Sequence, residues 1–371
     1  MASGEERQSS LRALQRMFVD DKLMNNFLIG RDFYDRHHSF LKSQFFECHS
    51  IMRDAFLACA LAWAAGEQEE RHQLDLSAVC YKRASSALST LRNFEVDNVS
   101  QMVDCLTLGG LCVTIAMKLG PSQIALISNK TLEMIRPIYN QQDVVDPDRL
   151  ALLTCLIFTD LEDSLIRCRL PTLRYKLPND RQYVDRYVGL CHSLLPHLHD
   201  IAEFATALRH ADDTDVLSIH QALVSVAESV IDWRSSPPTD LLKRFSGAEV
   251  SHLICQEHVL RAMALLIIHR LCHPFGVADE QAQLMANQIL AQLESTAQIT
   301  GSLTLLTELA LFAACMELRQ GDHRFDRMCL WLKGDEQLRD RLTAGMEFVR
   351  ATRDASGTVY WHDLGVIVGN L

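Results

Sequence analysis

Apolar residues recur at steps of three and four along almost the whole chain, which is the spacing of one face of an α-helix. Asp146 and Pro147 suit the start of such a helix. The stripe that follows them consists of Leu150, Leu153, Ile157, Leu161, Leu165 and Cys168. Strand-like alternation of single apolar and polar residues is almost absent. The pattern therefore predicts an all-α fold, a single multi-helix domain of roughly a dozen helices with no sheet.

Helix boundaries can be placed from residues with known positional preferences. Gly120 and Pro121 end one helix and begin the next, and Ser246 with Glu249 fits a capping box. The segments 171–180 and 233–240 interrupt the helical pattern, but neither is long or polar enough for a free linker. We therefore expect a flexible N-terminus over 1–10 and one helical domain over 11–371, with these two segments as candidate internal divisions.

The twelve cysteines are scattered singly through apolar stretches, without the C-x-x-C pairs of structural zinc sites. Such cysteines are typical of buried free thiols in a reducing compartment. The N-terminus lacks the apolar core of a signal peptide, and the longest uncharged apolar run, Cys105 to Met117, is shorter than the ~20 residues that span a bilayer. We expect a nuclear or cytoplasmic protein without a membrane segment.

The acidic charge balance bears on possible partners. The chain of 371 residues has a net charge of -11, whereas tight binding to a phosphate backbone requires clustered Lys and Arg. This balance argues against tight binding to a bare phosphate backbone. Gly109 and Gly110 lack the spacing of a phosphate-binding loop and favour close helix packing instead. No cofactor is expected.

His269, Cys272 and His273 are a weak candidate for a metal site. The two histidines are four residues apart and would lie on one helix face, as in H-x-x-x-H zinc sites, but Arg270 stands where the zinc proteases carry glutamate. The alternative is two partly exposed histidines at a helix end, where the helix dipole favours a positive imidazolium.

A second group of histidines precedes two acids: His192, His197 and His199, followed by Asp200 and Glu203. These residues could form a pH-sensitive or metal-binding loop. Solvated loop histidines are the alternative interpretation.

The candidate ligand pocket consists of Asp160, Asp163, Arg167 and Arg169 at the end of the apolar helix. These residues could line a pocket for an acidic small molecule. The alternative is an ion-paired helix end, because Asp163 and Arg167 are four residues apart.

Several segments together resemble the fungal-specific transcription factor domain, the helical regulatory region of fungal zinc-cluster regulators. The early ones are HHSFLKSQFFECHSIMRDAFLACALAWAAG, YKRASSALSTL, MVDCLTLGGLCVTIAMKLG and SQIALISNKTLEMI. A middle one is SVIDWRSSPP. The last ones are LTLLTELALFAACMELRQGDHR, FVRATRD and YWHDLGVIVGNL. The resemblance covers roughly 35–371, nearly the whole chain, and rests on packing positions.

The resemblance implies a transcription-regulatory domain, often for a biosynthetic or catabolic gene set. Such a domain would act through protein partners of the transcription machinery or a DNA-binding co-regulator, with small-molecule sensing and a homodimer as further options. The six closely spaced cysteines of the family's DNA-binding module are not found in this sequence, so we expect no direct DNA binding by this chain. The resemblance transfers no catalytic residue.

Two other functions remain open at this point. One is a pericyclase-like or cyclase-like catalyst of fungal secondary metabolism, built on the same scaffold after loss of the DNA-binding module. That function requires a deep, mostly apolar pocket with a few polar groups. The other is a passive scaffold subunit, which requires a large exposed apolar patch.

Overall fold

The computed structural model describes residues 12–19, 24, 27–47, 50–64, 70–143, 146–180, 182–319, 321–332, 336–355 and 357–365. Within these ranges the chain is helical and has no strand; the extended backbone contributes only an isolated bridge between Asp185 and Gly189. The prediction of an all-α fold is confirmed. The predicted flexible segment 1–10 lies outside the described residues.

The contacts divide the chain into two compact units, unit 1 from Met1 to Asp160 and unit 2 from Leu161 to Leu371. The dividing point lies inside helix α8 (Leu153–Arg167). The two loops considered from the sequence, 171–180 and 233–240, both lie within unit 2. A helix that runs through a boundary carries no Pro, Gly or polar linker by which a sequence pattern could mark it.

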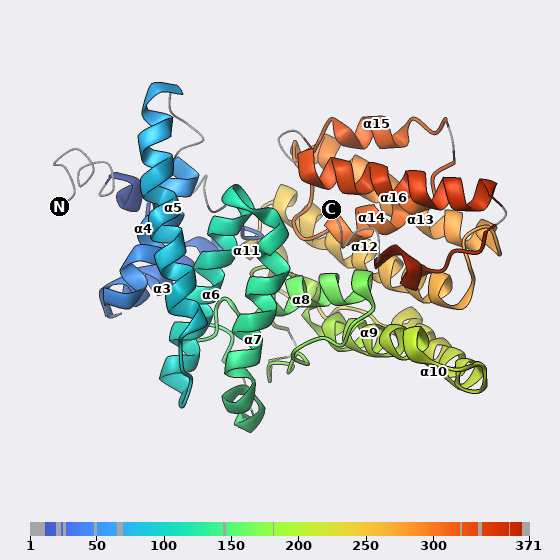
Figure 1. The fold of residues 1–371 in the computed structure, drawn as a ribbon, viewed down its shortest axis with the longest axis horizontal. Helices are drawn as coiled ribbons and strands as arrows, with labels where there is room; N and C mark the ends of the chain where they lie inside the picture. Colours follow the sequence, from blue (N-terminus) through green and yellow to red (C-terminus); the bar gives the residue numbers. More distant parts are fainter. Residues whose placement is uncertain are drawn as a thin grey trace. The chain divides into compact units, whose positions relative to one another are not determined.

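Unit 1 is built from α-helices and short 3₁₀ helices, which Figure 1 colours from blue to green. Helix α6 buries twelve of its residues and packs against α4, α5 and α7. The elements before α8 are η1 (Arg31–Phe33), α3 (Tyr34–Glu47), α4 (Ser50–Ala64), α5 (Glu70–Arg92), α6 (Val99–Leu119), η3 (Pro121–Gln123) and α7 (Ile124–Gln141).

Two adjacent glycines set the distance between α6 and its neighbours. A β-carbon added at Gly109 would overlap the side chain of Thr131 on α7, and one added at Gly110 would lie 2.8 Å from Leu152. Real β-carbons do not approach other atoms so closely, so only glycine allows this packing. The interpretation of this pair as a packing feature is confirmed.

Unit 2 begins with the last turns of α8 and centres on α12 (Gly247–Cys272), which contacts α9, α10, α13 and α14. Its other elements are η4 (Leu190–Leu194), α9 (Leu195–His210), α10 (Asp213–Asp232), α11 (Leu241–Arg244), α13 (Asp279–Thr300), α14 (Glu308–Met316), α15 (Arg324–Cys329), α16 (Glu336–Asp354) and η5 (Trp361–Asp363).

The capping box predicted for α12 is present. The backbone N–H of Ser246 donates to the carboxylate of Glu249 at 2.7 Å, and the N–H of Glu249 donates to the Ser246 hydroxyl at 3.4 Å. Two N–H groups that the first turn leaves without helical partners are thereby satisfied. Helix α12 ends at Cys272, two residues before Pro274.

The apolar stripe over 150–168 is buried along its whole length, as the periodicity predicts. The helix itself begins later than expected, at Leu153, because residues 147–152 form turns. Asp146 accepts the backbone N–H groups of Asp148 and Arg149, so its side chain caps this turn and not the first turn of α8.

Two helices are long and apolar enough to cross a membrane by length and composition, α6 and α12. Within the protein, 67% of the apolar window of α6 and 56% of that of α12 are buried. Such burial is typical of the core helix of a globular unit, which is apolar on nearly all sides because neighbouring helices cover it.

Eleven cysteines lie in the described residues, and all of them are free thiols. Cys48 lies outside the described residues. Eight of the eleven are buried, and burial raises the pKa of thiols such as Cys59, Cys105 and Cys112 to about 12. These thiols stay protonated at neutral pH and act as small apolar packing groups.

Candidate functional site

The carboxylate of Asp163, on α8, lies between two arginines. Nε of Arg167 donates to Oδ1 at 2.7 Å, and Nε of Arg169 donates to Oδ2 at 2.8 Å. Asp160, one turn earlier on the helix, is buried. The structure thus brings three of the four candidate pocket residues together, with both oxygens of Asp163 engaged by cations. Their role in ligand binding stays a prediction.

Glu162 lies next to Asp163 in sequence but in a different environment. Its carboxyl group accepts the backbone N–H of Leu309 in the first turn of α14, and its buried Oε1 has no hydrogen-bond partner. Burial, and then the negative charge of Glu308, raises the pKa of Glu162 well above its usual range. Glu308 is far away in the sequence, so no local pattern could have revealed this pair of acids.

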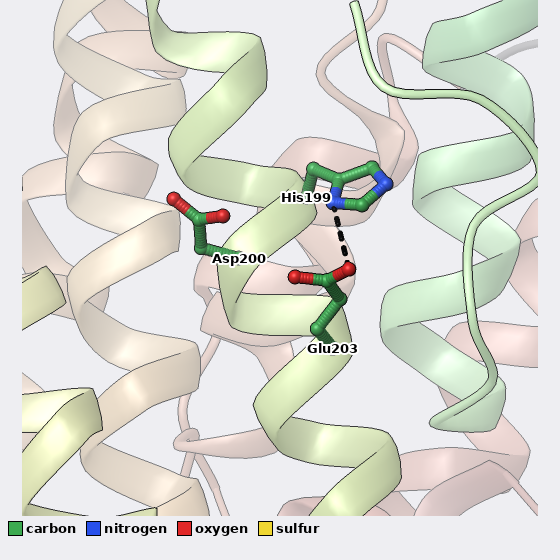
Figure 2. A group of neighbouring side chains, drawn as sticks. All are labelled: His199, Asp200 and Glu203. Carbon is green, nitrogen blue, oxygen red and sulfur yellow. Dashed lines mark ion pairs between the residues drawn. The ribbon is translucent and has the colours of Figure 1, made fainter.

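Helix α9 carries a compact group of possible metal ligands, His199, Asp200 and Glu203. Among the described residues it is the only set of three whose ligand atoms all lie within 4.8 Å of one another. Figure 2 shows Glu203 pointing to the imidazole of His199, with Oε1 3.7 Å from Nδ1. Of the other histidines predicted to join this group, His192 lies in η4 and His197 in the first turn of α9, and burial lowers the pKa of both.

The guanidinium of Arg174 already lies beside these possible metal ligands. Nη1 of Arg174 lies 2.6 Å from the carboxylate of Asp200, 4.0 Å from that of Glu203 and 3.4 Å from Nδ1 of His199. An arginine beside two carboxylates compensates their charge as a bound ion would. The arrangement fits an ion-pair network that holds the segment containing Arg174 against α9.

The weak metal candidate at the end of α12 is not brought together as a ligand set. Nε2 of His269 lies 3.2 Å from the carbonyl oxygen of Ala278, and no set of three ligand atoms within 4.8 Å includes His269, Cys272 and His273, all of which are described. Burial, followed by the charges of Arg270 and His273, lowers the pKa of His269 to about 4. The alternative interpretation, a partly exposed and positively charged imidazole, is therefore wrong for His269: the ring is buried, and desolvation outweighs the helix dipole.

Arg270, the residue between these histidines, is fully buried. Its guanidinium binds both carboxylate oxygens of Glu317 at 2.6 Å, Asp279 at 2.7 Å, and the carbonyl oxygens of Pro274 and Val277 at 2.9 Å. All five N–H donors of the side chain are satisfied. This network joins the ends of α12 and α14 with the start of α13, which is a structural role that the sequence did not indicate.

Unit 1 contains a surface hollow of about 460 Å³. It lies between α3, α6 and the turns before α8. The lining side chains are mostly polar or charged: Phe40, Ser43, Gln44, Glu47, Ser100, Val103, Asp104 and Arg149. Its volume falls within the range of small-molecule sites, about 300–1,000 Å³, but such sites usually have an apolar lining.

Comparison with known proteins gives one match. A family model described as the fungal specific transcription factor domain matches residues 37–344, which is most of both units. No curated protein and no solved structure is significantly similar to the chain. Because the family model covers well over half of the sequence, the chain belongs to the fungal-specific transcription factor domain family.

Proposed function

We propose that this chain is a transcription-regulatory domain that acts through protein partners in the nucleus. The observation that carries the proposal is the family match over residues 37–344. The partners are components of the transcription machinery or a DNA-binding co-regulator. The net charge of -11 supports a division of labour in which a co-regulator contacts the DNA.

The polar clusters of unit 2 support regulation over catalysis. The charged groups of Asp163, Arg174 and Arg270 bind internal partners at 2.6–2.8 Å, and such pairs hold segments together. The catalyst alternative needs a mostly apolar pocket, whereas the hollow in unit 1 has only Phe40 and Val103 as apolar lining residues.

The proposal is tested by deleting the gene in its host and measuring transcripts genome-wide, together with the location of a fluorescently tagged chain. We expect altered transcript levels for a defined gene set and accumulation in the nucleus. Unchanged transcripts together with exclusion from the nucleus would contradict the proposal.

A reporter experiment provides the control. The chain is fused to an unrelated DNA-binding domain, and reporter output is compared with that of the same fusion carrying Trp361→Ala. Trp361 is fully buried in unit 2, so this variant tests whether the signal requires the folded domain. Equal output from both fusions would mean that an unfolded apolar chain, and not the domain, recruits the partner.

The hollow in unit 1 supports small-molecule sensing as an added property. Glu47 and Asp104 supply two carboxylates and Arg149 one guanidinium, a set that favours a polar ligand with an amine or hydroxyl groups. Ligand-observed NMR with a mixture of polar metabolites tests it. We expect a binder whose signal is lost in Asp104→Ala and retained in Asp163→Ala. The reverse pattern would place the ligand at the arginine-bound carboxylate of unit 2.

A further inference from the structure

The loop between α10 and α11 is anchored at both of its ends. Trp233 is buried, and its indole N–H donates to the hydroxyl of Ser193 at 3.1 Å. Pro238 is buried as well, and its carbonyl oxygen accepts the backbone N–H of Leu241 at 3.1 Å. The packing of these two residues therefore holds the loop in place from its ends.

Between these anchors the chain presents Ser236 and Pro237 to solvent. Both residues are exposed, and the backbone over 234–237 is neither helical nor part of a turn. In the described part of the chain, no hydrogen bond joins the backbone of these four residues to other backbone groups. A residue that precedes proline is also biased towards the extended region. Ser236 therefore lies on an exposed, non-helical segment whose backbone groups another protein can reach.

The sequence of this segment is unique within the chain. Ser236 is the only serine or threonine that proline follows directly; the other eight prolines follow Gly, Arg, Asp, Leu, His or proline. Serine before proline is what proline-directed protein kinases recognise. These kinases bind the substrate extended and favour proline after the target hydroxyl, because proline has no backbone N–H to leave without a partner. The structure adds the access to the hydroxyl that a kinase requires.

We propose that Ser236 is a phosphorylation site for a proline-directed protein kinase. In that reaction, Oγ of Ser236 attacks the γ-phosphorus of ATP, the bond from this phosphorus to the β,γ-bridging oxygen breaks, and ADP leaves. The hydroxyl proton passes to the catalytic aspartate of the kinase, so the products are phosphoserine, ADP and a proton. This inference does not depend on the proposed function, since a scaffold or an enzyme could be modified in the same way.

The phosphate would change the charge of the surface at the end of α10. Arg261 lies there beside Arg234, and the acids Asp232 and Glu257 offset the two arginines. A phosphoserine adds about −1.5 to −2 charges at pH 7, which is about as large as the positive charge of both arginines together. Phosphorylation therefore turns a surface of mixed charge into an acidic one, and that change alters which charged partners bind to it.

Mass spectrometry of the full chain, purified from its host with phosphatase inhibitors, tests the site. We expect a peptide that carries phosphate on Ser236. The matched variants are Ser236→Ala and Ser235→Ala, because Ser235 is the neighbouring serine but is half-buried and does not precede proline. Ser236→Ala should abolish the phosphate on this peptide, and Ser235→Ala should retain it. Absence of phosphate from Ser236, or the opposite behaviour of the two variants, would overturn the proposal.

Phosphorylation of the purified chain by a kinase of the mitogen-activated class, with radiolabelled ATP, tests the kind of kinase. We expect wild type to take up label on Ser236, and Pro237→Ala to take it up more slowly by a factor on the order of ten. Pro237 is exposed, so this variant should keep the fold, which circular dichroism checks. Equal rates for wild type and Pro237→Ala would mean that proline is not recognised and would overturn the assignment to a proline-directed kinase.

Discussion

Arg270 and Glu317 form a two-point ion pair in the interior of unit 2, with both nitrogen–oxygen distances at 2.6 Å. The side chain of Arg270 is 0% exposed and that of Glu317 is 2% exposed. Burial raises the pKa of Glu317, and the hydrogen bonds from Arg270 act in the opposite direction. Each charge is tolerated in the interior because the other is present.

Removing one member of this pair should destabilise the protein strongly. We expect Arg270→Met to lower the free energy of unfolding by about 3–5 kcal/mol, since the carboxylate of Glu317 stays buried without its arginine. Glu317→Gln should cost less, because Arg270 keeps its ion pair with Asp279. Urea titration followed by circular dichroism measures this. The control is Arg327→Met, which breaks a partly exposed pair with Glu294 and should cost no more than ~1 kcal/mol. Similar losses in the buried and the exposed variants would contradict the interpretation.

Glu162 should make stability fall as the pH rises. Its pKa in the folded protein is raised above the value in the unfolded chain, so the folded state holds the proton more tightly. The resulting stabilisation is full below the unfolded pKa and is lost as the pH rises through the folded pKa. Glu162→Gln, which cannot ionise, should therefore melt at a higher temperature than wild type at neutral pH.

Melting curves between about pH 4 and pH 8 measure this difference, which should shrink towards the acid end. Asp163→Asn is the matched control, because its carboxylate is already bound by Arg167 and Arg169 and its loss should lower the melting temperature. A Glu162→Gln variant that is less stable than wild type at neutral pH would show that the carboxylate is well accommodated.

Gly109 should not tolerate even a methyl group. We expect Gly109→Ala to cost about 1–3 kcal/mol, because the new β-carbon overlaps Thr131 and forces α6 and α7 apart. At Gly247, the first residue of α12, no atom lies within 4 Å of an added β-carbon. Gly247→Ala should therefore be neutral or slightly stabilising. Thermal unfolding of the two variants side by side decides whether close helix packing explains Gly109.

Arg174 should suppress metal binding by the acids on α9. When Arg174→Ala removes the guanidinium, Asp200, Glu203 and His199 lose their internal cation. We expect Zn²⁺ to raise the melting temperature of this variant more than that of wild type. The added gain should disappear in Arg174→Ala/Glu203→Gln. An equal effect of Zn²⁺ on wild type and Arg174→Ala would show that the arginine does not compete with the ion.

Local signals in the sequence predicted the helices well. The stripe over 150–168, the capping box of Ser246 and Glu249, and the pairing of Asp163 with Arg167 all depend on residues within one or a few turns. The start of α8 was misplaced because Asp146 caps a turn, and a capped turn and a capped helix look alike in sequence.

The site environments could not be predicted in the same way. Arg174 meets Asp200, Arg270 meets Glu317, and Glu162 meets Glu308 only after helices distant in the chain have packed together. No spacing rule links such residues, and each looks like an ordinary solvated charge in its own segment. The sequence shows which side chains can be charged. The packing decides whether such a side chain is solvated, forms an ion pair or is neutralised by a proton.

The indole of Trp361 has a consequence for how the protein is made. Its N–H donates to the carbonyl oxygen of Leu165 at 2.7 Å, across 196 residues of chain, and the ring is fully buried. During translation, the end of α8 therefore lacks this packing partner until Trp361, 196 residues after Leu165, has left the ribosome. Unit 2 leaves apolar surface exposed throughout that interval, so chaperones should protect it until Trp361 has left the ribosome.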